Sequence, residues 1–132
     1  MENPSLLSHV SIGTNDYEKA ITFYDAVLLP LGIKKIMEHD NATAYGKQFP
    51  EFWVQKPYDN GKAECANGIH ISFLLDDAEA VDRFHRLAIE AGATDEGKPG
   101  PRAHYGAGYY GAFIRDLDGH KIEAMYWDAS KA

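Results

Sequence analysis

The chain contains two segments that repeat each other at a constant offset of 61 positions, and this duplication constrains the fold more than any other feature. Residues 9–12 read HVSI and residues 70–73 read HISF, so each copy opens on a histidine. The match continues through Asp16, Glu18 and Phe23 in the first copy and Asp77, Glu79 and Phe84 in the second. Such self-similarity predicts two copies of one supersecondary unit. If the copies pack side by side in one sheet, we expect the two histidines to face each other across a shared centre.

The first copy reads as a strand, a helix and three short extended segments. Apolar and polar residues alternate from Leu6 to Gly13, which is typical of a strand. Asp16 is expected to cap a helix that ends near Pro30. The extended segments are expected at residues 33–38, 43–46 and 52–55, followed by a loop at residues 57–67.

The second copy follows the same order. A strand is expected at residues 69–75, and Asp77 is expected to cap a helix whose C-cap is Gly92. The Gly/Pro-rich segment at residues 97–108 predicts a loop. A hairpin is expected at the end of the chain, with strands at residues 109–115 and 121–127 joined by the turn at residues 116–119.

These elements predict an α+β fold built from two tandem βαβββ modules, at about residues 6–57 and 68–127. At 132 residues the chain has the length of one domain. We expect the modules to form a curved, mostly antiparallel sheet whose outer face is covered by the two helices. The opposite face would then be free to curl around a ligand.

Strand alternation predicts that three side chains able to bind a metal share this free face. In the first strand Val10 and Ile12 are expected to pack against the helices, which turns His9 away from them. The same alternation places His70 on the free face of the second copy. In the last strand Ile122 and its apolar neighbours form one stripe, and Glu123 lies on the other with Met125 and Trp127.

Net charge and cysteine content limit the expected partners. A net charge of −7 opposes the attraction to phosphate that dominates nucleic-acid binding, so we expect no nucleic-acid partner. The sequence has neither an apolar run long enough to span a membrane nor the pattern of a secretory signal, so we expect no membrane partner. The single cysteine, Cys65, cannot form an intrachain disulfide and fits a reducing compartment. We therefore expect a cytoplasmic protein.

Three motifs carry a family resemblance that covers nearly the whole chain. They are HVSI at residues 9–12 leading to AITFY at 20–24, GIHI at 68–71, and RDLDGHKIE at 115–123, in which Leu117 stands where proline is usual. Together they resemble the vicinal oxygen chelate superfamily, which includes glyoxalase I, extradiol dioxygenases and fosfomycin- and bleomycin-resistance proteins. The resemblance implies paired modules whose sheet closes into a cup around a divalent metal.

Carried over residue by residue, the resemblance implies that His9, His70 and Glu123 are the metal ligands. Glyoxalase I has a fourth ligand, a glutamate on the last strand of the first module, and that position falls at about Phe52, which cannot bind a metal. Gly13 stands where glyoxalase I has an arginine for glutathione. The resemblance therefore implies the metal cup more directly than it implies lactoylglutathione lyase activity.

Two histidines and one carboxylate on one side of a metal leave other positions open to substrate or water. Zinc, nickel, iron and manganese are all compatible with this donor set. Such a metal can act as a Lewis acid on two neighbouring substrate oxygens, stabilising an enediolate or activating a catecholate. The alternative is that His9 and His70 are ordinary sheet histidines and that Glu123 is a solvated strand residue.

Aromatic and polar residues elsewhere are candidates for the walls of the cup. In the segment at residues 102–110, His104 or Tyr105 is a candidate general acid/base, beside Glu123 as a catalytic carboxylate. The remaining candidates are expected to bind substrate: Phe52, Trp53, Val54, Arg102, Tyr109, Tyr110, Met125 and Trp127. The alternative for the 102–110 segment is a rigid loop whose tyrosines cover a sheet edge.

Three functions are compatible with these patterns. The first is a glyoxalase-like, metal-dependent enzyme that acts on a small oxygenated or carbonyl substrate by lyase, isomerase or dioxygenase chemistry. The second is a metal-free protein that sequesters a small molecule, as a bleomycin-resistance protein sequesters its antibiotic. The third is a structural subunit whose cup is filled by its own aromatic side chains. A homodimer is expected in each case, because most soluble assemblies are two-fold homodimers.

Overall fold

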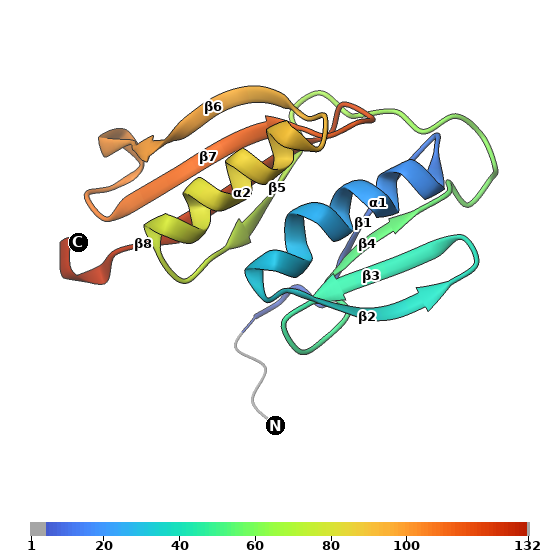
Figure 1. Cartoon of the computed structure of the whole chain (residues 1–132), viewed down its shortest axis with the longest axis horizontal. Helices are drawn as coiled ribbons and strands as arrows, with labels where there is room; N and C mark the ends of the chain where they lie inside the picture. The colour runs from blue at the N-terminus through green and yellow to red at the C-terminus, as the bar shows by residue number, and fades with distance from the viewer. Residues whose placement is uncertain (1–4, 132) are drawn as a thin grey trace. The chain divides into compact units, whose positions relative to one another are not determined.

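The computed structural model describes residues 5–131 and divides into two units, Met1–Ala63 and Glu64–Ala132. Each unit contains one α-helix and one four-stranded sheet, in the order strand, helix, strand, strand, strand. Figure 1 shows each helix lying along one face of the sheet of its own unit. The predicted α+β fold of two βαβββ modules is therefore confirmed, with each sheet mixed and open.

Unit one has the sheet order β1-β4-β3-β2, with β1 parallel to β4 and the other neighbours antiparallel. The Asp16 side chain accepts a hydrogen bond from the Lys19 amide and so caps α1 as predicted. Pro30 and Gly32, which has φ of 82°, end the helix through a short 3₁₀ turn. The elements are β1 (Val10–Gly13), α1 (Tyr17–Leu28), η1 (Leu29–Leu31), β2 (Lys34–His39), β3 (Ala42–Gly46) and β4 (Phe52–Gln55).

The core of unit one lies between α1 and its sheet. Tyr24 of α1 is 1% exposed, and its ring makes an edge contact with Phe52 of β4 at a centroid distance of 5.1 Å. The Tyr45 hydroxyl donates to Asp25 Oδ1 of α1 at 2.8 Å, which ties β3 to the helix. Strand alternation then places Trp53, between the buried Phe52 and Val54, on the face of the sheet away from α1.

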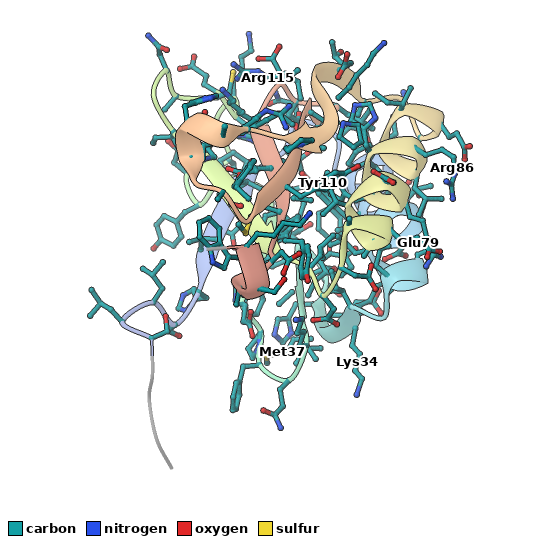
Figure 2. The ribbon with its side chains drawn as sticks, turned by 90° about the vertical axis from the view of Figure 1, so that its left-hand side faces the viewer. Lys34, Met37, Glu79, Arg86, Tyr110 and Arg115 are labelled. Carbon is teal, nitrogen blue, oxygen red and sulfur yellow. The ribbon has the colours of Figure 1, made fainter. Side chains whose placement is uncertain are left out.

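Unit two repeats this arrangement, with the sheet order β5-β8-β7-β6 and β5 parallel to β8. Asp77 caps the helix by accepting from the Ala80 amide, whereas the C-cap is Ala91 and Gly92 follows it with φ of 109°. Glu79 and Arg86 extend away from the helix in Figure 2. The elements are β5 (His70–Leu74), α2 (Ala78–Glu90), β6 (Thr94–Pro101), η2 (Ala103–Tyr105), β7 (Tyr109–Arg115), β8 (Lys121–Trp127) and η3 (Ala129–Lys131).

The core of unit two lies between α2 and the sheet. Phe84 of α2 is 1% exposed and makes an edge contact with Phe73 of β5 at 6.1 Å. Ile114 of β7 and Ile122 of β8 are fully buried on neighbouring strands. The apolar stripes predicted for β5 and β8 therefore face the helix, which turns the alternate residues to the other face.

The prediction of a loop over residues 97–108 is wrong for its first part, because β6 extends through Pro101. This strand lies at the edge of the sheet, where proline can be accommodated because one side of the strand makes no ladder bonds. Its pairing with β7 is irregular, with register shifts on both sides of Gly97. The glycines and prolines of this segment are typical of a loop, but the segment is extended because it pairs with β7.

The terminal hairpin matches its predicted bounds. The Asp116 side chain accepts from the amides of Asp118 and His120, and Gly119 takes up φ of 92°. This turn fixes the register in which Phe113 pairs with Glu123. Among the described helices, none is both long enough and apolar enough to cross a membrane.

Candidate metal and substrate site

The central pair of the site is His70 and Glu123, which meet on the face of unit two that α2 does not cover. In the parallel β5–β8 pair, His70 lies opposite Lys121 and Ser72 lies opposite Glu123. Because Phe73 faces α2, His70 faces the other way, and Glu123 does the same between Ile122 and Ala124, both fully buried. His70 Nε2 lies 3.0 Å from Glu123 Oε1.

The two partners differ in exposure. The Glu123 side chain is 10% exposed, whereas that of His70 is 46% exposed. A carboxylate so deep in the sheet requires polar partners, and its second oxygen, Oε2, accepts a 2.7 Å hydrogen bond from the Tyr109 hydroxyl. Burial, and next the hydrogen bond to Glu123, raises the pKa of Tyr109 well above its usual value, so this hydroxyl remains a donor.

Phe113 of β7 extends this face toward β6. Its ring centroid lies 6.1 Å from that of His70, and the Lys121 ammonium lies 5.1 Å from it. The Arg102 guanidinium lies 5.3 Å from the centroid of the Phe113 ring. Two cations therefore adjoin the ring next to the His70–Glu123 pair.

Arg102, predicted to bind substrate, is engaged with the backbone. Its guanidinium donates to the carbonyls of Lys98, Gly100 and Gly111 at 2.6–3.0 Å. These bonds cross the irregular part of the β6–β7 pairing. Arg102 thus holds β6 against β7, and a contact with substrate stays a prediction.

Residues of η2, in the predicted loop, form an aromatic cluster with Tyr109, the first residue of β7. His104 contacts Tyr105 at 4.2 Å between ring centroids, and Tyr105 makes an edge contact with Tyr109 at 5.0 Å. The Trp127 ring packs against Gly106, where an added Cβ would lie 2.3 Å from the indole. His104 and Tyr105 are exposed, and their acid/base role stays a prediction.

Tyr110 lies on the opposite face of β7 from Tyr109. Its hydroxyl donates to Asp82 Oδ1 of α2 at 2.7 Å, on the helix side of the sheet (Figure 2 labels Tyr110). Met125 and Trp127 follow Glu123 at alternate positions of β8 and so share its face. Of the two tyrosines predicted to bind substrate, the geometry favours Tyr109 as the one at the site.

In unit one the predicted residues divide between the two faces of the sheet. Phe52 and Val54 are buried on the helix side, whereas Trp53 lies on the other side and stacks on His39 with ring centroids 6.1 Å apart. His9 is exposed directly before β1, and its Nδ1 lies 2.9 Å from the Ser8 hydroxyl. Its role as a ligand stays a prediction.

The strand register corrects one equivalence between the copies. Ser11 pairs with Trp53 in unit one, and Ser72, at the same position of the repeat, pairs with Glu123 in unit two. The counterpart of Glu123 is therefore Trp53, not Phe52. Neither side chain can supply a carboxylate, so unit one lacks an acidic ligand at this position in either case.

The His70–Glu123 pair suits a divalent metal. Zinc binds imidazole nitrogen and carboxylate oxygen at about 2.0–2.2 Å, so two such donors on one ion lie about 3–3.5 Å apart. The 3.0 Å between Nε2 and Oε1 falls in that range. Across residues 5–131 no group of three His, Cys, Asp or Glu side chains that could hold a metal is found. The described residues thus supply two of the three predicted ligands in contact.

Sequence reasoning missed two contributors to this site. Tyr109 was predicted to bind substrate, which stays a prediction, and its hydrogen bond to Glu123 was not foreseen. Gly111 was not singled out, although a Cβ there would lie 2.1 Å from the Tyr109 hydroxyl oxygen. Both residues alternate with Phe113 along β7, and Phe113 pairs with Glu123. This spacing places them on the face of Glu123, but it can be interpreted only when the register is known.

Comparisons with known proteins agree with this architecture. The family model of the Glyoxalase/Bleomycin resistance protein/Dioxygenase superfamily matches residues 6–124. The chain is similar to the solved structure of a glyoxalase/bleomycin resistance protein from Albidiferax ferrireducens T118, with 34% identity and a TM-score of 0.85 over 94% of this chain and 100% of that one. The comparison with curated proteins gave no match.

Two further structures share the fold. One is a glyoxalase/bleomycin resistance protein/dioxygenase family enzyme from Burkholderia phytofirmans PsJN, at 21% identity and a TM-score of 0.71 over 92% of this chain and 98% of that one. The other is the fosfomycin resistance protein FosX from Listeria monocytogenes, at 17% identity and a TM-score of 0.67 over 96% and 97%. The fold is thus that of two βαβββ modules with a helix-free sheet face. The chain belongs to the Glyoxalase/Bleomycin resistance protein/Dioxygenase superfamily.

Proposed function

We propose that this protein is a glyoxalase-like, metal-dependent enzyme that acts on a small oxygenated or carbonyl substrate. The observation that supports this proposal most is the contact of 3.0 Å between His70 Nε2 and Glu123 Oε1 on the helix-free face of unit two. A buried carboxylate must be paired or hydrogen-bonded, and here one of its partners is a partly exposed imidazole, so the two donors together offer a cation an accessible place to bind. Family membership supports the same reading.

His70 and Glu123 would hold the metal together with His9, the histidine at the equivalent position of the first copy. Zinc, nickel, iron and manganese suit this donor set. When bound, the metal would supply Lewis acidity toward two neighbouring oxygens of the substrate. The negative charge of Glu123 would lower the net charge of the centre and leave the remaining positions to substrate.

The surrounding residues of unit two would bind and orient the substrate. Tyr105 contacts Tyr109, and Trp127 lies on the same face of β8 as Glu123, so their partly exposed rings would offer apolar surface to a substrate. Lys121 adds positive charge beside Phe113, which favours a substrate that carries or develops negative charge on oxygen. His104, exposed in η2, is the proposed general acid/base.

Lyase or isomerase chemistry and ring-cleaving dioxygenase chemistry both fit this site. Both require a metal with open positions and a substrate that presents two adjacent oxygens. The two differ in substrate and in metal, because dioxygenase chemistry requires iron or manganese and oxygen. A hemithioacetal and a catechol are therefore the two informative test substrates.

A second candidate function is a metal-free protein that binds or sequesters a small aromatic molecule. The observation in its favour is Trp53, which occupies the position equivalent to Glu123 and stacks on His39 with ring centroids 6.1 Å apart. Aromatic faces bind planar ligands without a metal. In that case the His70–Glu123 contact would be a plain hydrogen bond.

Metal content separates the two functions. Protein purified without chelator and analysed for Zn, Ni, Fe and Mn is expected to hold one metal per chain, and His70→Ala is expected to remove it while the protein stays folded. Loss of turnover of a hemithioacetal or a catechol should accompany the loss of metal. Metal-free protein that binds an aromatic ligand equally well with and without His70→Ala would support the binding protein instead.

We further propose that the enzyme is a cytoplasmic homodimer. The single cysteine, Cys65, is exposed and has no second thiol in its own chain to pair with, which fits a reducing compartment. Sedimentation at micromolar concentration is expected to give twice the monomer mass of 14.7 kDa. A monomer at that concentration would contradict the dimer without affecting the metal proposal.

A further inference from the structure

The carboxylate of Glu123 has two different partners, one for each oxygen. Oε1 faces His70 Nε2 at 3.0 Å, and Oε2 accepts from the Tyr109 hydroxyl at 2.7 Å. As whole residues, Glu123 is 7% exposed and Tyr109 is 6% exposed, so water does not compete freely for this second bond. A hydrogen bond from a hydroxyl to a carboxylate is among the stronger kinds, and its strength increases with burial.

The strand around Tyr109 is shaped to hold its hydroxyl in this place. Tyr109, Gly111 and Phe113 alternate along β7 on the face that carries Glu123, which pairs with Phe113. Gly111 leaves the space in which the Tyr109 ring lies along the strand, since a Cβ there would come within 2.1 Å of the hydroxyl oxygen. Tyr105 supports the ring from the side through an edge contact at 5.0 Å.

We propose that Tyr109 is a positioning residue that fixes the Glu123 carboxylate, so that one oxygen faces His70 and is presented to a metal while the other is occupied. The metal-binding part of this inference rests on the proposed function, whereas the orientation of Glu123 toward His70 does not. Partners that orient a ligand carboxylate in this way typically contribute about 10–100-fold to metal affinity.

The assignment differs from a substrate-binding role. The hydroxyl donates its proton to Glu123, so it cannot donate the same proton to a substrate oxygen. If Tyr109 is replaced by phenylalanine, Oε2 becomes a buried oxygen without its hydroxyl donor, which is unfavourable. The carboxylate is then expected to turn toward water and leave His70.

Tyr110→Phe is a matched control for Tyr109→Phe. Tyr110 is the next residue on the same strand, and its hydroxyl donates to the carboxylate of Asp82 at the same distance of 2.7 Å. It does so on the helix side of the sheet. Each change therefore removes one tyrosine–carboxylate hydrogen bond, and a merely structural role would make the two variants alike in their effect on His70.

The first measurement is made without metal. In ¹⁵N-histidine-labelled protein the imidazole nitrogen shifts report which ring nitrogen carries the proton. Because a carboxylate accepts but does not donate, His70 is expected to carry its proton on Nε2. Tyr109→Phe should shift this population toward Nδ1, and Tyr110→Phe should leave it unchanged.

The second measurement uses Co²⁺ as the probe. Tyr109→Phe is expected to weaken Co²⁺ binding by about 10–100-fold and to change the visible d–d absorption bands, whereas Tyr110→Phe should keep wild-type binding. Wild-type His70 signals in Tyr109→Phe would overturn the orientation of Glu123 by Tyr109. A changed tautomer with unchanged Co²⁺ affinity would overturn the contribution to metal binding. A wild-type protein that binds no Co²⁺ would count against the proposed metal dependence, and the tautomer measurement would still decide the role of Tyr109.

Discussion

Among single residues, the proposed metal site depends most on how the Glu123 side chain is placed. Its backbone position on β8 turns the side chain away from the helix, and its two oxygens meet an imidazole and a phenol. The same residue in a solvated strand would need neither partner. The chemistry of the site thus follows from one carboxylate that is buried and oriented.

Glu123→Gln tests that carboxylate with little change in volume. The amide oxygen can still accept from Tyr109, but the negative charge that attracts a divalent cation is lost, and a neutral amide is a weaker ligand. We expect the variant to unfold cooperatively and to lose its stoichiometric metal in elemental analysis. Glu96→Gln is the control, since Glu96 of β6 pairs with Arg115 at 2.9 Å and should not affect metal content. Full metal content in Glu123→Gln would contradict the assignment.

At the scale of elements, β7 serves the core with one face and the site with the other. Ala112 and Ile114 are fully buried toward α2, while Tyr109, Gly111 and Phe113 lie on the face of Glu123. Neighbouring residues of one strand therefore have separable roles, because alternate side chains point to opposite faces.

Gly111→Ala is expected to disturb the site without touching a ligand. The added methyl group would lie 2.1 Å from the Tyr109 hydroxyl and force the ring away from Glu123, with a loss of about 1–3 kcal/mol in the free energy of unfolding. Gly100, directly opposite in the β6–β7 register, offers the matched change, because a Cβ there meets nothing within 4 Å. Denaturant unfolding and metal titration should separate the two variants. Equal behaviour would show that Tyr109 adapts freely.

The hydrogen bond between His85 of α2 and Asp95 of β6 predicts part of the loss of folding stability in acid. A hydrogen bond with His85, aided by the Gly97 amide, lowers the pKa of Asp95 below its ordinary value of 3.8. The ionised form is thus favoured by folding, so this contribution to stability is present above pH 3.8 and is lost as the pH falls through the lowered pKa. In acid titrations followed by circular dichroism, Asp95→Asn should be less stable at neutral pH and should lose less stability below pH 3.8. If the acid unfolding curves of Asp95→Asn and the wild type coincided below pH 3.8, this contribution of Asp95 would be ruled out.

At the scale of the whole molecule, the two units share one strand order but carry different side chains at equivalent positions. His9 and His70 both lie where the first strand begins, whereas Trp53 is the counterpart of Glu123. A histidine therefore stands at this position in both copies, whereas the carboxylate is present in the second copy alone. The donor set that the sequence offers is two imidazoles and one carboxylate.

His9→Ala tests whether the first copy contributes to metal binding. We expect the variant to weaken binding to an extent similar to His70→Ala, because each removes one imidazole from the proposed donor set. His39→Ala, which removes an exposed imidazole from β2 of the same unit, should bind metal normally. Calorimetric titration with Zn²⁺ compares the three. Normal affinity in His9→Ala would limit the centre to residues of unit two.

Sequence reasoning reached those parts of the molecule that depend on local signals. Asp16 and Asp77 identified both helix starts, and the Asp116–Gly119 turn identified the last hairpin with its correct bounds. Alternation alone placed His70 and Glu123 on one face. These features depend on periodicity and capping, which are legible in a single sequence.

What the sequence did not reveal depends on pairing between strands. The glycines and prolines of β6 indicate a loop, and only the partnership with β7 makes this segment a strand. Sequence reasoning placed the counterpart of Glu123 at Phe52, whereas the strand pairing places it one residue later, at Trp53. The position could not be fixed without knowing the register of the strands. The engagement of Tyr109 with Glu123 likewise joins positions 14 residues apart through a hairpin register.

The most direct test of the central claim is anomalous diffraction at the zinc edge from crystals of the Zn²⁺-loaded protein. We expect one strong anomalous peak within bonding distance of His70 Nε2 and Glu123 Oε1, with the Tyr109 hydroxyl still on Oε2. Crystals in which His70 and Glu123 keep their contact of 3.0 Å with no anomalous peak beside them would contradict the claim.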